Sequence, residues 1–164
     1  MNELSSDLEI KIINENPVIS WGTEESMIGT RNVENTKGLI APEGYYDPIF
    51  IWLSKVSIQL PKGYSALIMH PLNRYDLPFI TLGGIVDADH TISNTNIPFF
   101  LKKGFEGIIE RGTPIAQIIP FKRENWISQK DKDLFINNYT YMKESRLHVT
   151  SLYKKKYWHK KNYE

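Results

Sequence analysis

Residues 83–122 read GGIVDADHTISNTNIPFFLKKGFEGIIERGTPIAQIIPFK, and this stretch decides the fold class. Short runs of β-branched and aromatic residues alternate in it with turns that contain glycine or proline. This pattern is typical of short antiparallel strands and not of helices. The strands predicted within it are Gly84–Val86, Ile97–Leu101, Phe105–Ile109 and Ile115–Phe121. The stretch therefore predicts an all-β fold.

The same pattern continues on the N-terminal side of this stretch. The further predicted strands are Ile49–Leu53, Val56–Leu60, Ser65–His70 and Phe79–Leu82. Residues 1–48 contain two short apolar runs, Leu8–Ile13 and Pro17–Trp21, broken by Gly, Asn and Pro, which predicts an irregular N-terminal segment. The spacing shows no βαβ units, so a barrel, sandwich or jelly-roll-like body is favoured over a parallel sheet.

The C-terminal part of the chain differs in composition from the rest. A helix is predicted within residues 127–142, and the tail over 143–164 is rich in lysine and aromatic residues. We therefore divide the chain into a β domain over residues 1–126 and a helical, basic and aromatic extension over residues 127–164. We expect the tail to dock on a neighbouring subunit; contact with nucleic acid is the alternative that we favour less.

Composition places the chain among ordinary globular proteins. It has 164 residues, of which 41% are hydrophobic and 24% charged, and its formal net charge is +1. A chain near neutrality has no overall field that attracts nucleic acid or a membrane surface. There is no cysteine, which excludes disulfides and thiolate metal sites. No signal-like N-terminus or membrane-length apolar run is present, so we expect a soluble, cytoplasmic protein with no membrane partner.

Two aspartates close the first strand of the quoted stretch. Asp87 and Asp89 are two positions apart, so on an extended chain their side chains share a face. Such a pair can bind a divalent cation, orient a water molecule or accept hydrogen bonds from a sugar hydroxyl. It can equally cap a tight turn. Gly83 and Gly84 precede the pair and let another group approach the backbone closely.

Three short pieces, in this order along the chain, resemble the dUTPase and dCTP-deaminase family. Leu60–Tyr64 is similar to the turn before that family's phosphate motif, Gly84–Asp89 to its nucleoside-binding turn, and Gly112–Ile118 to the later strand that lines its phosphate site. The resemblance covers roughly residues 56–122. It implies a β-clip or distorted-barrel fold, a homo-oligomer that is commonly a trimer, and a role for Asp87 in activating the attacking water of the hydrolases.

The chain departs from the family at several functional positions. His90 stands where the hydrolases have a tyrosine that packs on deoxyribose, and residues 70–76 lack the serine pair of the phosphate motif. The lysine- and tyrosine-rich tail replaces the glycine-rich closing arm, and Thr95–Pro98 offers no glutamate for deamination. These departures predict a protein that has kept the fold and lost most of the catalytic apparatus.

Side chains that can hold an anionic ligand remain at the matching positions. Arginine supplies a planar fork for phosphate, and His, Asn and Gln supply further hydrogen-bonding groups. The predicted ligand-binding residues are His70, Asn73, Arg74, Asp87, Asp89, His90, Arg111 and Gln117. The alternative is structural: an arginine beside Asp76 forms a salt bridge, and a lone histidine holds a loop. His70, Asp87, Asp89 and His90 have metal-ligand chemistry, but their spacing is not diagnostic and we predict no metal site.

Three functions remain open from the sequence. The first is a non-catalytic protein that binds a nucleotide or nucleotide-derived small molecule, with no cofactor. The chain also resembles uncharacterised proteins of tailed phages, which implies a place in the host cytoplasm and sequestration of a host signalling nucleotide. The second is a Mg²⁺-dependent nucleoside triphosphate pyrophosphatase that uses Asp87. The third is a structural or assembly protein of a virion.

Overall fold

A computed structural model describes residues 2–31, 37–47, 49–89, 93–147 and 158–160. The chain divides into two compact units, Met1–Glu124 and Asn125–Glu164. The division lies two residues before the boundary that the composition suggested, after residue 126. All the strands of the described residues belong to the first unit.

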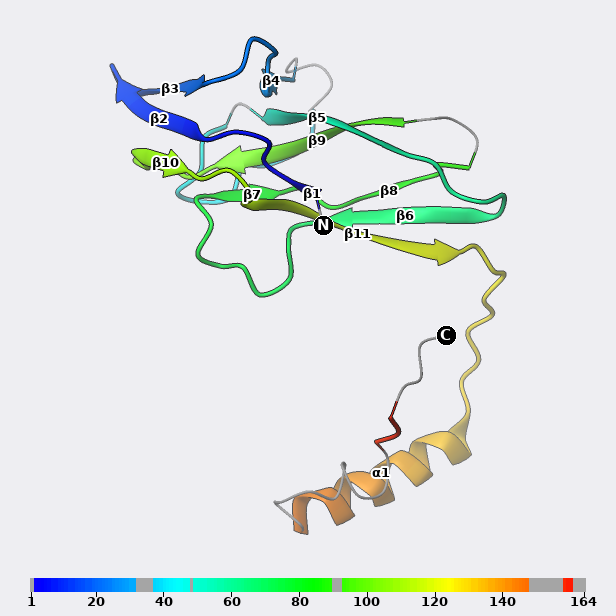
Figure 1. Ribbon diagram of the computed structural model, residues 1–164. Coiled ribbons are helices and arrows are strands. Elements are labelled where there is room, and N and C mark those ends of the chain that lie inside the picture. The colour runs from blue at the N-terminus through cyan, green and yellow to red at the C-terminus, as the bar shows by residue number, and fades with distance from the viewer. Residues whose placement is uncertain (1, 32–36, 48, 90–92, 148–157, 161–164) are drawn as a thin grey trace. The chain divides into compact units, whose positions relative to one another are not determined.

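The first unit is built from three antiparallel sheets (Figure 1). The strand orders are β1-β11-β6-β8, β10-β2-β3 and β4-β5-β9-β7. The strands are β1 (Asn2–Glu3), β2 (Leu8–Ile13), β3 (Asn16–Trp21), β4 (Ile28–Thr30), β5 (Phe50–Ile58), β6 (Tyr64–Met69), β7 (Phe79–Thr81), β8 (Gly84–Val86), β9 (Ser93–Leu101), β10 (Gly107–Ile109) and β11 (Pro114–Lys122). The all-β prediction is confirmed at this level.

The segment 1–48, which was expected to be irregular, contains the four strands β1 to β4. Its strands show the alternation of buried and exposed side chains that is typical of a half-buried sheet. In β2, Leu8 and Ile10 are buried while Glu9 and Lys11 are exposed, as expected for a strand with one face on the core. The turn from β2 to β3 has Asn14 and a neighbouring glutamate at positive φ, the backbone that matches the twist of a tight hairpin.

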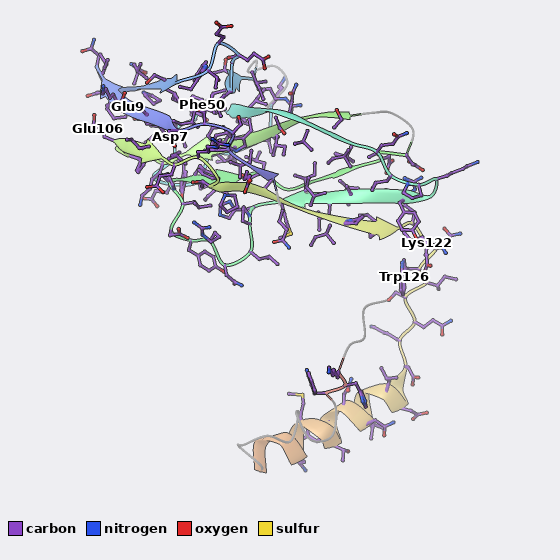
Figure 2. All side chains as sticks on the ribbon, viewed as in Figure 1. Asp7, Glu9, Phe50, Glu106, Lys122 and Trp126 are labelled. Atoms are coloured by element: carbon purple, nitrogen blue, oxygen red, sulfur yellow. The ribbon has the colours of Figure 1, made fainter. Side chains whose placement is uncertain are left out.

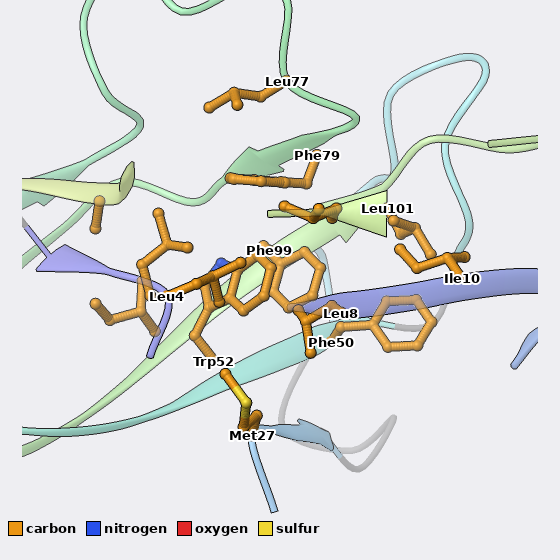
Figure 3. Packing of buried hydrophobic residues seen from close by; sticks show 14 of the residues in the cluster. Leu4, Leu8, Ile10, Met27, Phe50, Trp52, Leu77, Phe79, Phe99 and Leu101 are labelled. Atoms are coloured by element: carbon orange, nitrogen blue, oxygen red, sulfur yellow. The ribbon is translucent and has the colours of Figure 1, made fainter. Parts of the chain in front are cut away.

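Aromatic stacking forms the centre of the core. The rings of Trp52 and Phe99 stack with centroids 3.8 Å apart, and Phe79 meets Trp52 edge to face at 4.9 Å (Figure 3). All three side chains are almost fully buried. They come from β5, β9 and β7, which are neighbours in one sheet, and Leu8 and Ile68 join them from the other two sheets. One continuous core therefore holds the three sheets together.

The observed strands differ from the predicted ones in several places, and β9 begins at Ser93 and not at Ile97. The runs predicted at Ile49–Leu53 and Val56–Leu60 form the single strand β5, with an irregular register between Leu53 and Ser57. Such a bulge interrupts the apolar pattern of the strand, and the interrupted pattern predicts two strands in place of one. The strands β1 and β4 were not predicted, because two or three residues carry no readable period. β10 begins at Gly107 and not at Phe105.

The second unit contains one helix, α1 (Lys132–Leu147). The carboxylate of Asp131 accepts hydrogen bonds from the backbone N–H groups of Asp133 (2.9 Å) and Leu134 (3.2 Å), which caps the helix start. The helix thus begins inside the predicted range of 127–142 and ends five residues beyond it, at Leu147. No helix among the described residues is long and apolar enough to cross a membrane. Most of the basic tail, residues 148–157 and 161–164, lies outside the described residues.

Candidate functional site

The first aspartate of the pair is held by two side chains of the protein. Asp87 follows β8 directly, and its Oδ1 accepts a hydrogen bond from the Ser65 hydroxyl at 2.5 Å. The Arg123 guanidinium donates to the same oxygen from Nη1 at 3.0 Å. Ser65 is itself buried, and Arg123 comes directly after β11. Three separate strands therefore meet at Asp87.

The second aspartate is more deeply enclosed. The side chain of Asp89 is 0% exposed, and its Oδ2 accepts a hydrogen bond from the backbone N–H of Gly63 at 2.8 Å. The Arg123 guanidinium donates to both oxygens, from Nη1 to Oδ1 at 3.1 Å and from Nη2 to Oδ2. A two-pronged arginine contact of this kind is among the strongest of protein hydrogen bonds. We call Ser65, Asp87, Asp89 and Arg123 the aspartate clasp.

Backbone contacts fix the arginine in place. The N–H of Arg123 donates to the carbonyl of Gly63 at 2.8 Å, and its Nη1 donates to the carbonyl of Tyr64 at 3.1 Å and to the Ser65 hydroxyl at 3.0 Å. On the aspartate side, the N–H of Leu60 donates to the carbonyl of Ala88 at 3.1 Å. The clasp thus joins the start of β6, the end of β8 and the end of β11.

Hydrogen bonds and the guanidinium charge favour the ionised form of Asp87 and the protonated form of Arg123 in the clasp. The Ser65 hydroxyl, and after it the Arg123 guanidinium, lower the pKa of Asp87 against the opposing effect of burial. The hydrogen bond to Asp89 raises the pKa of Arg123. A carboxylate with a lowered pKa is a weaker general base, because a general base works best when its own pKa lies near the working pH. The arrangement favours the capping interpretation of the aspartate pair.

The same geometry argues against Mg²⁺ at the two aspartates. A divalent cation needs several oxygen ligands, and both oxygens of Asp89 and the Oδ1 of Asp87 already accept from a guanidinium, a hydroxyl or an N–H. Within the parts of the chain that the structure describes, no group of three or more His, Asp or Glu side chains is placed to hold a metal ion.

A second set of predicted residues meets in the loop between β6 and β7. The ring of His70 contacts the carbonyl of Arg74 through Nε2 at 2.9 Å, and its Nδ1 accepts from the N–H of Thr81 at 3.3 Å. The Oε1 of Gln117, on β11, accepts from the N–H of Leu72 at 3.2 Å. These contacts hold the loop from its inner side. We call residues 70–76 the presenting loop.

The presenting loop turns its charged and aromatic side chains outward. Arg74 forms a two-pronged ion pair with Asp76, with both contacts at 2.8 Å. This pair lowers the pKa of Asp76 to about 2. Asn73 has φ 63°, in the left-handed region that asparagine tolerates better than most residues. Tyr75 is 89% exposed. The loop therefore has a defined conformation and presents the Arg74 guanidinium and the Tyr75 ring at neighbouring positions of the chain.

The predicted residues do not gather at one place within the chain. His70, Asn73, Arg74 and Gln117 meet at the presenting loop, whereas the two aspartates lie at the other end of β6. The six residues of β6 at about 3.3 Å each separate the two ends by roughly 20 Å.

The remaining two predicted residues lie elsewhere. Arg111 donates from its N–H to Asp7 at 2.6 Å, and Figure 2 shows Asp7 far from Lys122, the neighbour of Arg123. His90 lies outside the described residues.

Sequence reasoning missed the two residues that complete the clasp. β6 lies between β8 and β11, and the aspartate turn after β8 meets the end of β11 at Arg123. An arginine two residues after the predicted strand Ile115–Phe121 was the available signal. Ser65, a hydroxyl within an otherwise apolar run, was the other.

Comparison of the chain with protein-family models, with curated proteins and with solved structures gives no match.

Proposed function

We propose that this protein is a non-catalytic binding protein that holds a nucleotide or a nucleotide-derived small molecule on the presenting loop. One observation carries the proposal: Asp87, the residue that hydrolysis would need as a base, is engaged by Ser65 and Arg123. At the opposite end of the sheet, Arg74 and Tyr75 face outward on a loop that is held from within. The geometry therefore supports recognition better than turnover.

The chemistry of the loop suits a phosphate joined to an aromatic base. The guanidinium of Arg74 is 39% exposed and its partner Asp76 is 62% exposed, so their ion pair is weakly stabilising and an incoming phosphate can compete for the fork. The ring of Tyr75 offers a face on which a base can stack. A loop that is already ordered loses less entropy when it binds.

The resemblance of residues 56–122 to the dUTPase and dCTP-deaminase family supports the nucleotide as ligand class. Under this proposal the first unit is a β-clip of that kind, acts as a homo-oligomer such as a trimer, and needs neither a metal nor another cofactor. Its place is the cytoplasm, and sequestration of a host signalling nucleotide by a phage protein is the use that the resemblance suggests.

Calorimetric titration with a panel of nucleoside mono-, di- and triphosphates and cyclic dinucleotides tests the proposal. We expect saturable binding by the native protein, and affinities lower by about tenfold or more in Arg74→Ala and Tyr75→Ala, since each loses a charged or stacking contact. Lys11→Ala and Tyr139→Ala are matched controls, because both side chains are exposed and far from the loop in sequence. Absence of binding across the panel would exclude the proposed ligand class.

The enzymatic alternative has its own measurement. Pyrophosphate release from nucleoside triphosphates with Mg²⁺ present should stay at the background rate for the native protein. Release that exceeds the background, and that disappears in a folded Asp87→Asn variant, would refute the non-catalytic assignment.

A further inference from the structure

The imidazole of His70 links the presenting loop to a neighbouring strand through both ring nitrogens. A backbone N–H can only donate, so the contact from Thr81 requires an unprotonated Nδ1. A carbonyl oxygen can only accept, so the contact with Arg74 requires a hydrogen on Nε2. Together the two contacts demand the neutral imidazole in its Nε2–H tautomer.

This neutral ring ties the middle of the loop to β7. The carbonyl of Arg74 is the loop atom that it holds, and Thr81, whose side chain is buried, is the strand residue. The ring also meets Phe79 edge to face at 5.9 Å. The other ties of the loop are neutral as well: Gln117 holds the N–H of Leu72, and a turn contact joins residues 71 and 74.

Protonation removes the basis of this link. An added proton on Nδ1 would face the N–H of Thr81, so an acceptor becomes a second donor and the contact turns repulsive. The N–H of Thr81 then loses its partner beside a buried side chain, which is unfavourable. The ring has to rotate or withdraw, and the carbonyl of Arg74 is released with it. An unperturbed histidine changes its charge between about pH 5 and 8, which is the range in which the link is to be tested.

The charged groups that the described residues bring near this ring are Arg74 and Asp76, both on the loop itself. They pair with each other, and Asp76 also interacts electrostatically with His70, which contributes to the lowered pKa of the Asp76 carboxyl. β7 contributes the Phe79 ring and the Thr81 amide, and β11 contributes the neutral Gln117. No fixed charge of the adjoining strands therefore replaces the hydrogen bonds that protonation breaks.

We propose that His70 is a pH-sensitive lock: the neutral ring holds the presenting loop in shape, and protonation releases it. The consequence for ligand binding rests on the proposed function. Because Arg74 and Tyr75 both lie on the released segment, mild acid should weaken nucleotide binding.

Nuclear magnetic resonance of the ligand-free protein tests the lock without any ligand. At pH 8 the ring ¹⁵N shifts should report the Nε2–H tautomer. Between pH 8 and pH 5 the exchange protection factor of the Thr81 amide should fall by about tenfold or more, together with shifts of residues 71–76, while amides of β5 and β9 keep theirs. An Nδ1–H tautomer at pH 8, or unchanged Thr81 protection after the ring has protonated, would overturn the lock.

The variant His70→Asn separates the lock from a general effect of acid. Its side-chain oxygen can accept from Thr81 and does not titrate, so the Thr81 protection factor should be equal at pH 8 and pH 5. His159→Asn, which replaces an exposed histidine of the second unit, should respond to pH as the native protein does. If His70→Asn fails to fold, the tautomer and protection of the native protein still decide.

A binding measurement connects the lock to the proposed function. For any nucleotide that binds, the native protein should bind about fivefold or more weakly at pH 5.5 than at pH 7.5, and His70→Asn should change by less than about twofold. An equal pH dependence in both proteins would overturn the lock. Failure of every nucleotide to bind at either pH would refute the proposed function, while the ligand-free experiment would still judge the lock.

Discussion

The sheet β1-β11-β6-β8 ends in two polar networks of opposite character. At the clasp end, two carboxylates and a guanidinium turn toward one another, and one carboxylate is fully enclosed. At the loop end, neutral groups of His70 and Gln117 hold the backbone, while Arg74 and Tyr75 face solvent. Charge that is used internally stabilises the fold, whereas charge held at the surface by neutral groups is left available to a ligand. The clasp at one end of β6 thus stabilises the fold, whereas the presenting loop at the other end is left to bind a ligand.

Replacement of Arg123 should produce the largest effect. In Arg123→Ala the buried Asp89 carboxylate loses its cationic partner, and an uncompensated buried charge is strongly destabilising; we expect Tm to fall by roughly 5–10 °C. Thermal unfolding measures this. The double variant Arg123→Ala/Asp89→Asn should recover part of the loss, because the orphaned charge is gone. Equal losses in both variants would mean that the clasp contributes only packing.

Acid should weaken the clasp before it weakens the core. The pKa of Asp87 lies below its ordinary value of 3.8, so the stability it contributes is complete above that value and is lost as the pH falls through the lowered pKa. Tm measured from pH 6 to pH 2.5 should therefore drop below about pH 4. In Ser65→Ala the hydroxyl that lowers the pKa of Asp87 is absent, so less stability should be lost on acidification. Parallel curves would contradict this assignment.

Asn73 tests the shape of the presenting loop. A β-branched residue is strained at the φ of 63° found there, so Asn73→Val should cost about 1–2 kcal/mol in the free energy of unfolding. Asn73→Gly, which tolerates this backbone, should change it little. Urea unfolding of both variants gives the comparison. A similar loss in both would point to the asparagine side chain and not to the backbone.

Gln117 should show the smallest effect. Gln117→Ala removes the acceptor of the Leu72 N–H, but the contact is exposed and water can replace it, so a loss of about 1 kcal/mol or less is expected. Thermal unfolding of Gln117→Ala beside Arg123→Ala compares the two ends of the sheet directly. A loss from Gln117→Ala as large as that from Arg123→Ala would end the contrast between them.

Most strands could be predicted from local sequence patterns, whereas the aspartate clasp depends on pairing between residues far apart in the sequence. The apolar runs at Ser65–His70 and Ile115–Phe121 were readable as strands, whereas the strand at Leu8–Ile13 was not predicted although its side chains alternate. The bulge in β5 was not readable from the sequence, since it interrupts the alternation of side chains along the strand. Arg123 pairs with residues 34 and 36 positions away, and its partners depend on β6 lying between β8 and β11. A single sequence does not report this strand order.

The position of Arg123 has a consequence for synthesis of the chain. It stands next to the last residue of the first unit, and β11 also pairs with β1 at the opposite end of that unit. Until the ribosome has released residue 123, the sheet lacks β11, which lies between β1 and β6, and Asp89 lacks its counter-ion. A nascent chain that stalls within β11 should therefore remain open to proteases and chaperones until Arg123 has left the ribosome and can pair with Asp89.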